Sequence, residues 1–409
     1  MTTQADAGVV PAPRFVVAAG PLFDHPAATS PCWAASLAQA IFRTMWAHRY
    51  AILSRHKGYE FHLAEPGDFT VGSVAYCDPA VVVHNPACSF YTLDAARQEA
   101  VFVETPADLD LTTFPFVFLA QFQHATHVIR VPLAALPDLA ATIRPVLTSP
   151  ILVHSVGRCG STLVSRAFAA VPAVCSLSEP DVFTHLTIWR GTAVLPPDEL
   201  QVLVEACTRI TCKPHRDGTA PTHFAIKFRA QCIELADMFA MAFPDARQLY
   251  LTRAPLEWLD SIFRAFVPPE LVDDPATRRI LEEVFANVHP LLRELRDPAQ
   301  PMPVWKTWIL VWIANTETHR RLRAAGTRFV ELDYAELRTA PEECIRRIFV
   351  QCGIPLTHWD RVLASLDRDS QEGSMVARSE TRDAARRLPE TLRGQAAALL
   401  QSRGHRARE

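Results

Sequence analysis

The stretch PILVHSVGRCGSTLVSRAFAA, residues 150–170, decides the fold. It opens with PILVHS, a short apolar run of the kind that forms a buried strand, so we expect a strand over residues 150–155. A loop with two glycines follows, and then a helix over about residues 161–170. In this strand–loop–helix setting, backbone N–H groups and the helix dipole can hold a phosphate group.

The loop differs from the one that Mg-nucleotide hydrolases and kinases use. Their pattern, GxxxxGK[ST], carries a lysine, whereas here Gly160 is followed directly by Ser161 and Thr162. Arg158 could supply positive charge from inside the loop instead. The simpler alternative is a glycine turn that only lets a helix pack on a strand, and the strand–loop–helix context disfavours it.

After residue 145, short apolar strands alternate with helices, which is typical of an α/β fold with a mostly parallel sheet. We expect four further strands, over residues 173–177, 223–227, 247–252 and 328–332, and helices over residues 198–211, 255–266 and 341–351. Ligands of such sheets bind outside the carboxyl ends of the strands. Charged or phosphate-binding groups recur at these ends, at residues 157–162, 178–179, 227–229, 253 and 333–334.

The segment RCGSTL, residues 158–163, resembles the RSGTTL loop of the P-loop sulfotransferases. The resemblance implies that the loop binds the 5′-phosphosulfate of 3′-phosphoadenosine 5′-phosphosulfate (PAPS), through Gly157, Arg158, Cys159, Gly160, Ser161 and Thr162. Cys159 replaces the usual serine of the family, and a thiol is a poorer hydrogen-bonding group. A cysteine at a helix N-terminus could alternatively have a lowered pKa and act as a nucleophile.

A second segment, LYLTRAPLEWLDSIFR at residues 249–264, resembles the second signature of the same family. There the resemblance implies that Arg253 and Ser261 bind the 3′-phosphate of PAPS. Arginine suits this role because it holds a phosphate through bidentate hydrogen bonds. Arg378 and the stretch DSQEGS, residues 369–374, lie where relatives often close the cofactor site.

The resemblance also implies the catalytic residues. Glu179, in SEPD, is the candidate general base that removes the proton of the acceptor, and Asp181, His185 and the more distant His223 are its competitors. Lys227, one of only four lysines in the chain, is placed to stabilise charge on the leaving oxygen. Arg229 is expected to contact the acceptor or a phosphate.

Composition narrows the other possibilities. The net charge of -3 and pI near 6.6 argue against a general nucleic-acid binder, because no positive excess is available for a phosphate backbone. The ten cysteines are scattered without a CxxC pair, which disfavours zinc and disulfides and favours a reducing cytoplasm. His124 and His127 lack a matching third ligand, and we expect neither a metal site nor a membrane span.

Three parts are expected along the chain: a flexible leader at residues 1–20, a small α+β domain at 21–145, and a sulfotransferase domain at 146–409. The family resemblance covers about residues 146–380 and leaves the N-terminal domain without a role. Within that domain we expect a helix over residues 33–50 and strands over 71–76, 81–84, 100–104 and 116–122.

The sequence therefore predicts an enzyme that moves a sulfuryl group from PAPS to a hydroxyl or amine, leaving 3′,5′-ADP and using no metal. The acceptor is expected to be a small molecule, a glycan or a carrier-bound group, and the N-terminal domain could support an oligomer. Two alternatives stay open: a phosphoryl transferase with a degenerate loop, and a nucleotide-binding protein without catalysis.

Overall fold

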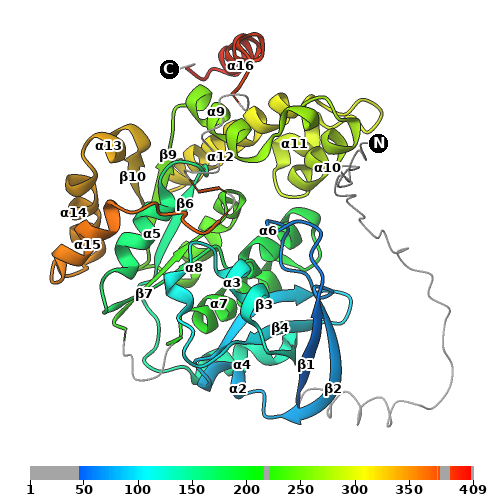
Figure 1. The fold of residues 1–409 in the computed structure, drawn as a ribbon, viewed down its shortest axis with the longest axis vertical. Coiled ribbons are helices and arrows are strands. Elements are labelled where there is room, and N and C mark those ends of the chain that lie inside the picture. Colours follow the sequence, from blue (N-terminus) through cyan, green and yellow to red (C-terminus); the bar gives the residue numbers. More distant parts are fainter. Residues whose placement is uncertain (1–45, 216–220, 375, 378–386, 407–409) are drawn as a thin grey trace, which may run out of the picture.

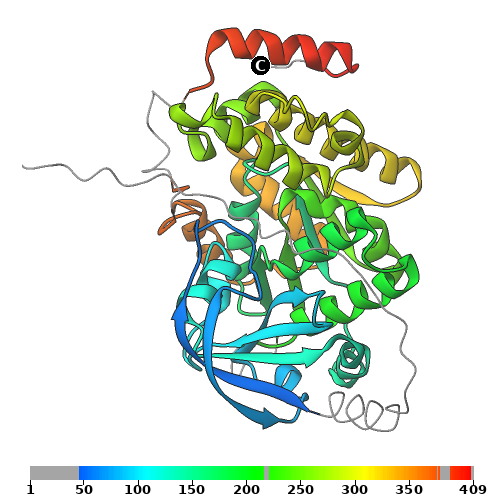
Figure 2. The same ribbon diagram turned by 90° about the vertical axis from the view of Figure 1, so that its right-hand side faces the viewer.

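Two five-stranded sheets organise the protein, as the computed structural model in Figure 1 shows. The structure describes residues 46–215, 221–374, 376–377 and 387–406. The leader at 1–20, residues 33–45 of the expected first helix, and Arg378 lie outside the described residues. In Figures 1 and 2 the parallel sheet lies between the antiparallel N-terminal sheet and the helices α9 to α12 and α16.

The second sheet is parallel throughout, with the strand order β10-β9-β6-β8-β7. Its strands are β6 (Ile151–Ser155), β7 (Val174–Ser178), β8 (His223–Lys227), β9 (Arg247–Thr252) and β10 (Phe329–Asp333). All five predicted strands are confirmed to within one residue at each end. They could be predicted because helices cover both faces of the sheet, so each strand is a nearly continuous apolar run.

Strand β6 lies at the centre of the sheet. After β6 the chain first forms β7 and β8 on one side of it, and then crosses to form β9 and β10 on the other side, so the strand order reverses at β6. The crevice outside the carboxyl end of a strand at such a switch point is where α/β sheets bind their ligands. The loop after β6 occupies this place.

Helices cover both faces of this sheet. They are α5 (Ser161–Ala169), α6 (Val182–Thr192), α7 (Pro197–Thr211), α8 (Ala236–Ala242), α9 (Pro255–Phe266), α10 (Pro275–Ala286), α11 (Pro290–Leu295), α12 (Val304–Ala324), α13 (Tyr334–Thr339), α14 (Pro341–Cys352), α15 (Trp359–Leu366) and α16 (Glu390–Ser402). Side chains of β6 alternate between the faces, so Ile151 and Val153 pack with α5, α9, α12 and α14, whereas Leu152 packs with α6, α7 and α8. No described helix is long and apolar enough to cross a membrane.

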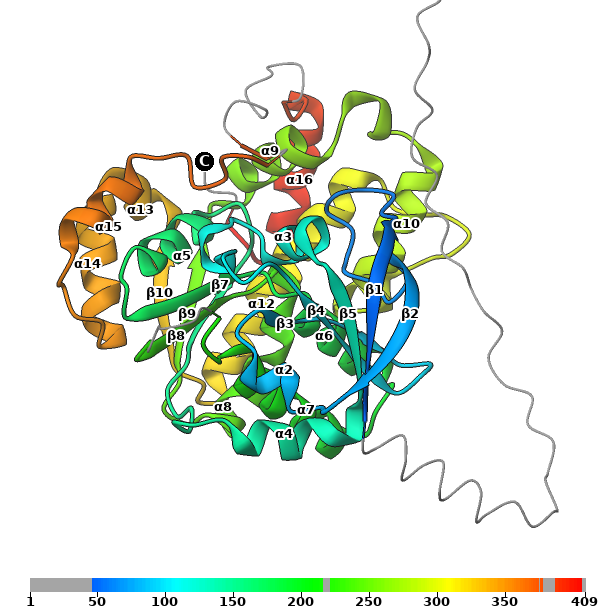
Figure 3. The same ribbon diagram turned by 60° about the horizontal axis from the view of Figure 1, so that its bottom comes forward.

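The N-terminal sheet is antiparallel, with the order β2-β1-β5-β4-β3. Its strands are β1 (Ala47–Arg55), β2 (Phe69–Cys77), β3 (Cys88–Asp94), β4 (Glu99–Glu104) and β5 (His127–Pro132), and its helices include α2 (Val81–His84), α3 (Val117–His124) and α4 (Leu136–Thr142). The predicted strands at 71–76 and 100–104 are confirmed. In Figure 3 the hairpin of β1 and β2 lies at the opposite end of the molecule from α14 and α15.

Three N-terminal predictions are wrong. Residues 47–50 form strand β1 instead of a helix, because β1 pairs with both β2 and β5. Residues 81–84 form a helical turn after Asp78, whose carboxylate accepts from Ala80 N at 2.8 Å. Residues 117–122 belong to α3, where a short, continuously buried apolar run shows no period that separates helix from strand.

The two sheets share an apolar core. One hydrophobic cluster combines Phe90 and Phe102 of the N-terminal sheet with Leu152 of β6 and with Phe183 and Phe228. Segments from before and after residue 145 therefore stabilise each other by burying a common surface. The division into domains at 21–145 and 146–409 stays a prediction.

Candidate active site

The loop after β6 is held in an unusual backbone conformation. Gly157, Arg158 and Gly160 have positive φ angles of 77°, 50° and 84°. A Cβ atom at position 160 would lie 2.5 Å from the side chain of Leu337, so glycine is favoured there on both counts. Ser161 then begins α5, and the first N–H groups of this helix face the loop.

Side chains of Trp258 in α9 and of Arg253, the residue after β9, fix this loop. Trp258 donates its indole N–H to the carbonyls of Val156 and Gly157, at 2.9 Å each. Arg253 donates from a terminal guanidinium nitrogen to the carbonyl of Arg158 at 3.0 Å. The two segments that carry the family signatures are thus joined by direct hydrogen bonds.

Arg158, expected to bind the 5′-phosphosulfate, lies beside Arg253 and Ser261, expected to bind the 3′-phosphate. Arg158 donates from Nε to the hydroxyl of Ser261 at 3.3 Å, and from a terminal nitrogen to Gln371 Oε1 at 2.8 Å. The Arg253 guanidinium lies over the ring of Tyr334, 4.4 Å from its centroid. The hydrogen bond from Arg158 to Gln371 places the stretch 369–374 against the loop, where the resemblance expects it.

The two arginines of this group repel each other, and their nearby carboxylates are Glu257 and Asp369. Burial and the neighbouring charge of Arg253 lower the pKa of Arg158 to about 10, so the Arg158 guanidinium remains charged at neutral pH. Arg253 has a carboxylate nearby, Glu257 Oε2 at 3.5 Å from Nε, but that buried Nε has no hydrogen-bond partner among the described residues. A bound polyanion would relieve the repulsion and supply acceptors for these donors.

Cys159 does not fit the role of nucleophile. Its side chain is fully buried, and Sγ lies 3.5 Å from the carbonyl oxygen of Leu251, to which it can donate. Burial raises the pKa of the thiol, which keeps it protonated. The alternative of a reactive cysteine is wrong because the side chain points into the core and only its backbone belongs to the loop.

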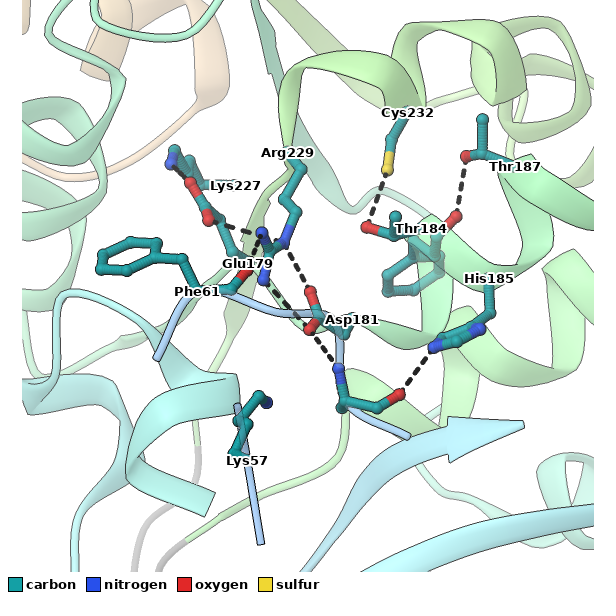
Figure 4. Close-up of polar contacts among 12 residues, drawn as sticks. Lys57, Phe61, Glu179, Asp181, Thr184, His185, Thr187, Lys227, Arg229 and Cys232 are labelled. Carbon is teal, nitrogen blue, oxygen red and sulfur yellow. Dashed lines mark hydrogen bonds and ion pairs between the residues drawn. The ribbon is translucent and has the colours of Figure 1, made fainter. Parts of the chain in front are cut away.

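Glu179 and Lys227 form an ion pair at the neighbouring strand ends (Figure 4). The last residues of β7 and β8, Ser178 and Lys227, are paired in the sheet, and Glu179 N donates to Lys227 O at 2.6 Å. Glu179 has a φ of 57°, a strained value for a residue other than glycine. Strain of this kind persists where the surroundings impose it, and here it turns the carboxylate toward Lys227, whose Nζ donates to Oε1.

Asp181, which is fully buried, and Arg229, which is largely buried, form a second pair beside the first. Arg229 donates from Nε to Oδ1 at 2.6 Å and from a terminal nitrogen to Oδ2 at 3.1 Å. The backbone N–H of Ala64 donates to the same Oδ2 at 2.9 Å. Because these bonds occupy both oxygens, the geometry disfavours Asp181 as the base.

The two histidines are also poor candidates for the base. His185 Nε2 lies 2.7 Å from the carbonyl oxygen of Ala64, so this nitrogen carries the proton, and burial lowers the pKa of the ring. His223 is the first residue of β8, at the end of the sheet opposite to Glu179. Glu179 is thus the candidate that lies at the carboxyl edge beside the loop.

The contribution of the N-terminal region was missed by the sequence reasoning. Phe61 accepts a hydrogen bond at its carbonyl from Arg229, at 3.2 Å, and Ala64 contacts both Asp181 and His185. These residues belong to the connection between β1 and β2, more than a hundred positions before their partners. No spacing or motif in this connection signals the contact.

Comparison with known proteins identifies the class of protein. The model of the sulfotransferase family matches residues 150–358, just over half of the 409 residues, and the chain belongs to this family. The matched residues contain the loop after β6, the Glu179–Lys227 pair, Arg253 and Ser261, whereas the N-terminal sheet lies outside them.

Distant likenesses exist among solved structures. A sulfotransferase from Alicyclobacillus acidocaldarius is 14% identical, with 63% of this chain and 93% of that chain covered and a TM-score of 0.38. A sulfotransferase from Mycobacterium avium is 15% identical, with 66% and 79% covered and a TM-score of 0.34. Retinol dehydratase in complex with retinol and PAP is 13% identical, with 65% and 85% covered and a TM-score of 0.31. Comparison with curated protein sequences gives no match.

Proposed function

We propose that this protein transfers a sulfuryl group from PAPS to a hydroxyl or amine acceptor. The observation that carries the proposal is the cluster of Arg158, Arg253 and Ser261 beside a glycine loop, at the sheet edge that also holds Glu179 and Lys227. The cluster supplies cationic and hydroxyl groups for a polyanion, and the pair supplies a base and a positive charge.

Each part of the donor has a matching group in the chain. Arg158 and the N–H groups of residues 160–162 suit the 5′-phosphosulfate, since a helix N-terminus favours negative charge. Arg253 and Ser261 suit the 3′-phosphate, which ATP lacks. The proposal of PAPS as donor rests on this match and on membership of the sulfotransferase family.

Glu179 and Lys227 divide the chemistry between them. Glu179 accepts the proton of the acceptor group while the acceptor atom forms its bond to sulfur and the bond from sulfur to the phosphate oxygen breaks. Lys227 stabilises the charge that collects on this leaving oxygen. The products are the sulfated acceptor and 3′,5′-ADP, with the proton on Glu179.

The ion pair between these residues has a consequence for the order of events. While Nζ of Lys227 is bonded to Glu179, the carboxylate is held in place and its Oε1 is occupied by this hydrogen bond. A donor that draws Lys227 toward its own bridging oxygen frees Glu179 to accept a proton. The base would then become active only when the donor is bound.

Calorimetry of nucleotide binding tests the proposal. We expect 3′,5′-ADP to bind more tightly than AMP, because only the former carries the phosphate that Arg253 and Ser261 would hold. Equal affinities for the two nucleotides would contradict it. Turnover of ATP that depends on Mg²⁺ would favour a phosphoryl transferase instead, and tight 3′,5′-ADP binding without transfer to any acceptor would favour a non-catalytic binding protein.

A further inference from the structure

The N-terminal region reaches the site through the connection between β1 and β2. Residues 57–64 of this connection, here called segment 57–64, lie against the Asp181–Arg229 pair in Figure 4. The segment is held there by three hydrogen bonds: Ala64 N to Asp181, Arg229 to Phe61 O, and His185 to Ala64 O. A buried charge pair at this position makes the docking of the segment specific, because undocking it would leave Asp181 and Arg229 with unpaired groups.

Four phenylalanines form an aromatic wall around this segment. Phe61 is at its centre, with ring centroids 5.0 Å from Phe116, 5.8 Å from Phe118 and 6.1 Å from Phe266, each in an edge-to-face arrangement. Phe116 and Phe118 are buried, whereas Phe61 and Phe266 are partly exposed. The aromatic wall thus has a rigid base and an accessible part.

The aromatic wall extends from the Glu179–Lys227 pair to the cluster of Arg158, Arg253 and Ser261. At one end, Nζ of Lys227 lies 5.8 Å from the centroid of the Phe116 ring. At the other end, the guanidinium of Arg158 lies 6.0 Å from the centroid of Phe266. An acceptor whose hydroxyl reaches Glu179, beside Lys227, would therefore place its body against this wall.

Charge at the acceptor end of the wall is balanced within the chain. Three of the four lysine and arginine side chains beside the wall have a carboxylate partner: Lys57 with Asp68, Lys227 with Glu179, and Arg229 with Asp181. The fourth, Arg158, lies at the donor end over Phe266, so among the described residues these pairs leave no surplus cation at the acceptor end for an anionic acceptor. The faces of aromatic rings carry partial negative charge and would repel one.

We propose that the aromatic wall binds the acceptor, and that the acceptor is an uncharged aromatic or apolar alcohol rather than an anionic glycan. This inference rests on the proposed function, since the wall has an acceptor to bind only if sulfuryl transfer takes place. Burial of apolar area against the wall drives binding. It also assigns a role to the N-terminal region: segment 57–64 and residues 114–118 determine which acceptors bind.

Binding of 2-naphthol to the full-length protein saturated with 3′,5′-ADP tests the inference. We expect saturable binding to one site by calorimetry. Loss of one aromatic contact is worth roughly two- to tenfold in affinity, so Phe61→Ala should weaken binding by that factor and Phe61→Leu by less. Phe61 is the residue to change because it is only half-buried, whereas Phe116→Ala would open a cavity in the core.

Tyr76→Ala is the matched control, because Tyr76 is an exposed aromatic residue of the same region on β2. It should leave 2-naphthol binding unchanged, and all variants should keep the wild-type affinity for 3′,5′-ADP. Absence of 2-naphthol binding, equal binding by Phe61→Ala and the wild type, or sulfation of glucuronate in preference to 2-naphthol would each overturn the inference. Those results would leave the proposed function standing as long as 3′,5′-ADP binds, whereas absence of 3′,5′-ADP binding would overturn both.

Discussion

On the donor side of the site, formed by Arg158, Arg253 and Ser261, two guanidiniums lie close together, and the buried Nε of Arg253 has no hydrogen-bond partner among the described residues although Glu257 and Asp369 are nearby. On the acceptor side, Lys227 pairs with Glu179 and Arg229 pairs with Asp181, and Arg229 Nε also lies 3.9 Å from Glu179 Oε2. The donor side thus keeps positive charge that a ligand can neutralise. On the acceptor side the charges are balanced within the chain, because a buried charge without a partner would destabilise the fold more than a paired one.

This difference separates the expected effects of mutation. Changes on the donor side should alter nucleotide affinity, because the positive charge there is completed by the ligand. Changes on the acceptor side should alter turnover or folding, since each charge there is a structural partner of another. The predictions below begin with the acceptor side, where the expected effects are largest.

Glu179→Gln should reduce turnover by about 10²- to 10⁴-fold, the typical contribution of a positioned general base. Glutamine keeps the size and polarity of the side chain but cannot accept a proton at neutral pH. The rate should be measured with labelled PAPS and an acceptor that the wild type sulfates, with 3′,5′-ADP affinity as the internal control. Glu205→Gln, a change at a partly exposed glutamate on α7, should be neutral. If the Glu179→Gln variant keeps more than about a tenth of wild-type activity, the base lies elsewhere, and His185→Ala would be the next variant to make.

Asp181→Asn should destabilise the fold by about 3 kcal/mol, because the largely buried Arg229 would lose the carboxylate that accepts two of its hydrogen bonds and would keep, among the described residues, only Glu179 Oε2, 3.9 Å from its Nε, as a counter-charge. The amide would also bring an NH₂ group to face either Arg229 or the N–H of Ala64, both of which are donors. Urea unfolding monitored by circular dichroism measures the loss. The control is Asp273→Asn, which alters an exposed Asp–Arg pair and should change stability little. Similar, small losses in both variants would remove Asp181 from this structural role.

The two sides also differ in what could be predicted from the sequence. Loop 157–160, Arg253 and Ser261 follow apolar strands in one continuous region, so the pattern of strands and the family signatures placed them together. The contact of Ala64 with the Asp181–Arg229 pair could not be predicted, because no local pattern encodes it. The N-terminal sheet was predicted poorly for the same reason: β1 forms through pairing with distant strands, which outweighs local preference.

Arg253→Ala should weaken 3′,5′-ADP binding by roughly ten- to hundredfold, since a hydrogen bond to a charged group is worth about 1.5–3 kcal/mol. AMP lacks the 3′-phosphate, so its affinity should hardly change. Calorimetry with both nucleotides gives the comparison directly. Equal losses for the two would mean that Arg253 supports the loop through its bond to Arg158 O and does not hold the 3′-phosphate.

The free energy of unfolding should decrease as the pH falls, because β6, the central strand below both the donor and the acceptor side, contains a buried histidine. His154 in β6 is fully buried, donates from Nε2 to Gln248 Oε1 at 3.0 Å, and has a pKa lowered by burial to about 3. The unfolded chain binds this proton near pH 6.5, so stability is complete above that pH and falls as pH drops toward 3, by about 1.4 kcal/mol per unit. Urea unfolding between pH 7.5 and 5 measures the slope, which His154→Gln should flatten; an unchanged slope would contradict this origin.

Ser261→Ala should have the smallest effect, a loss of about two- to tenfold in 3′,5′-ADP affinity, because a neutral hydroxyl contributes about 0.5–1.5 kcal/mol. Ser261 accepts a hydrogen bond from Arg158 Nε, so part of the loss would come from a less ordered Arg158. The double variant with Arg253→Ala separates these contributions. If both side chains hold the same phosphate, the combined loss will differ from the sum of the single losses, as expected for residues in one network. Strictly additive losses would mean that Ser261 acts on the donor side only through Arg158, which would leave Arg253 as the group that distinguishes a 3′-phosphate.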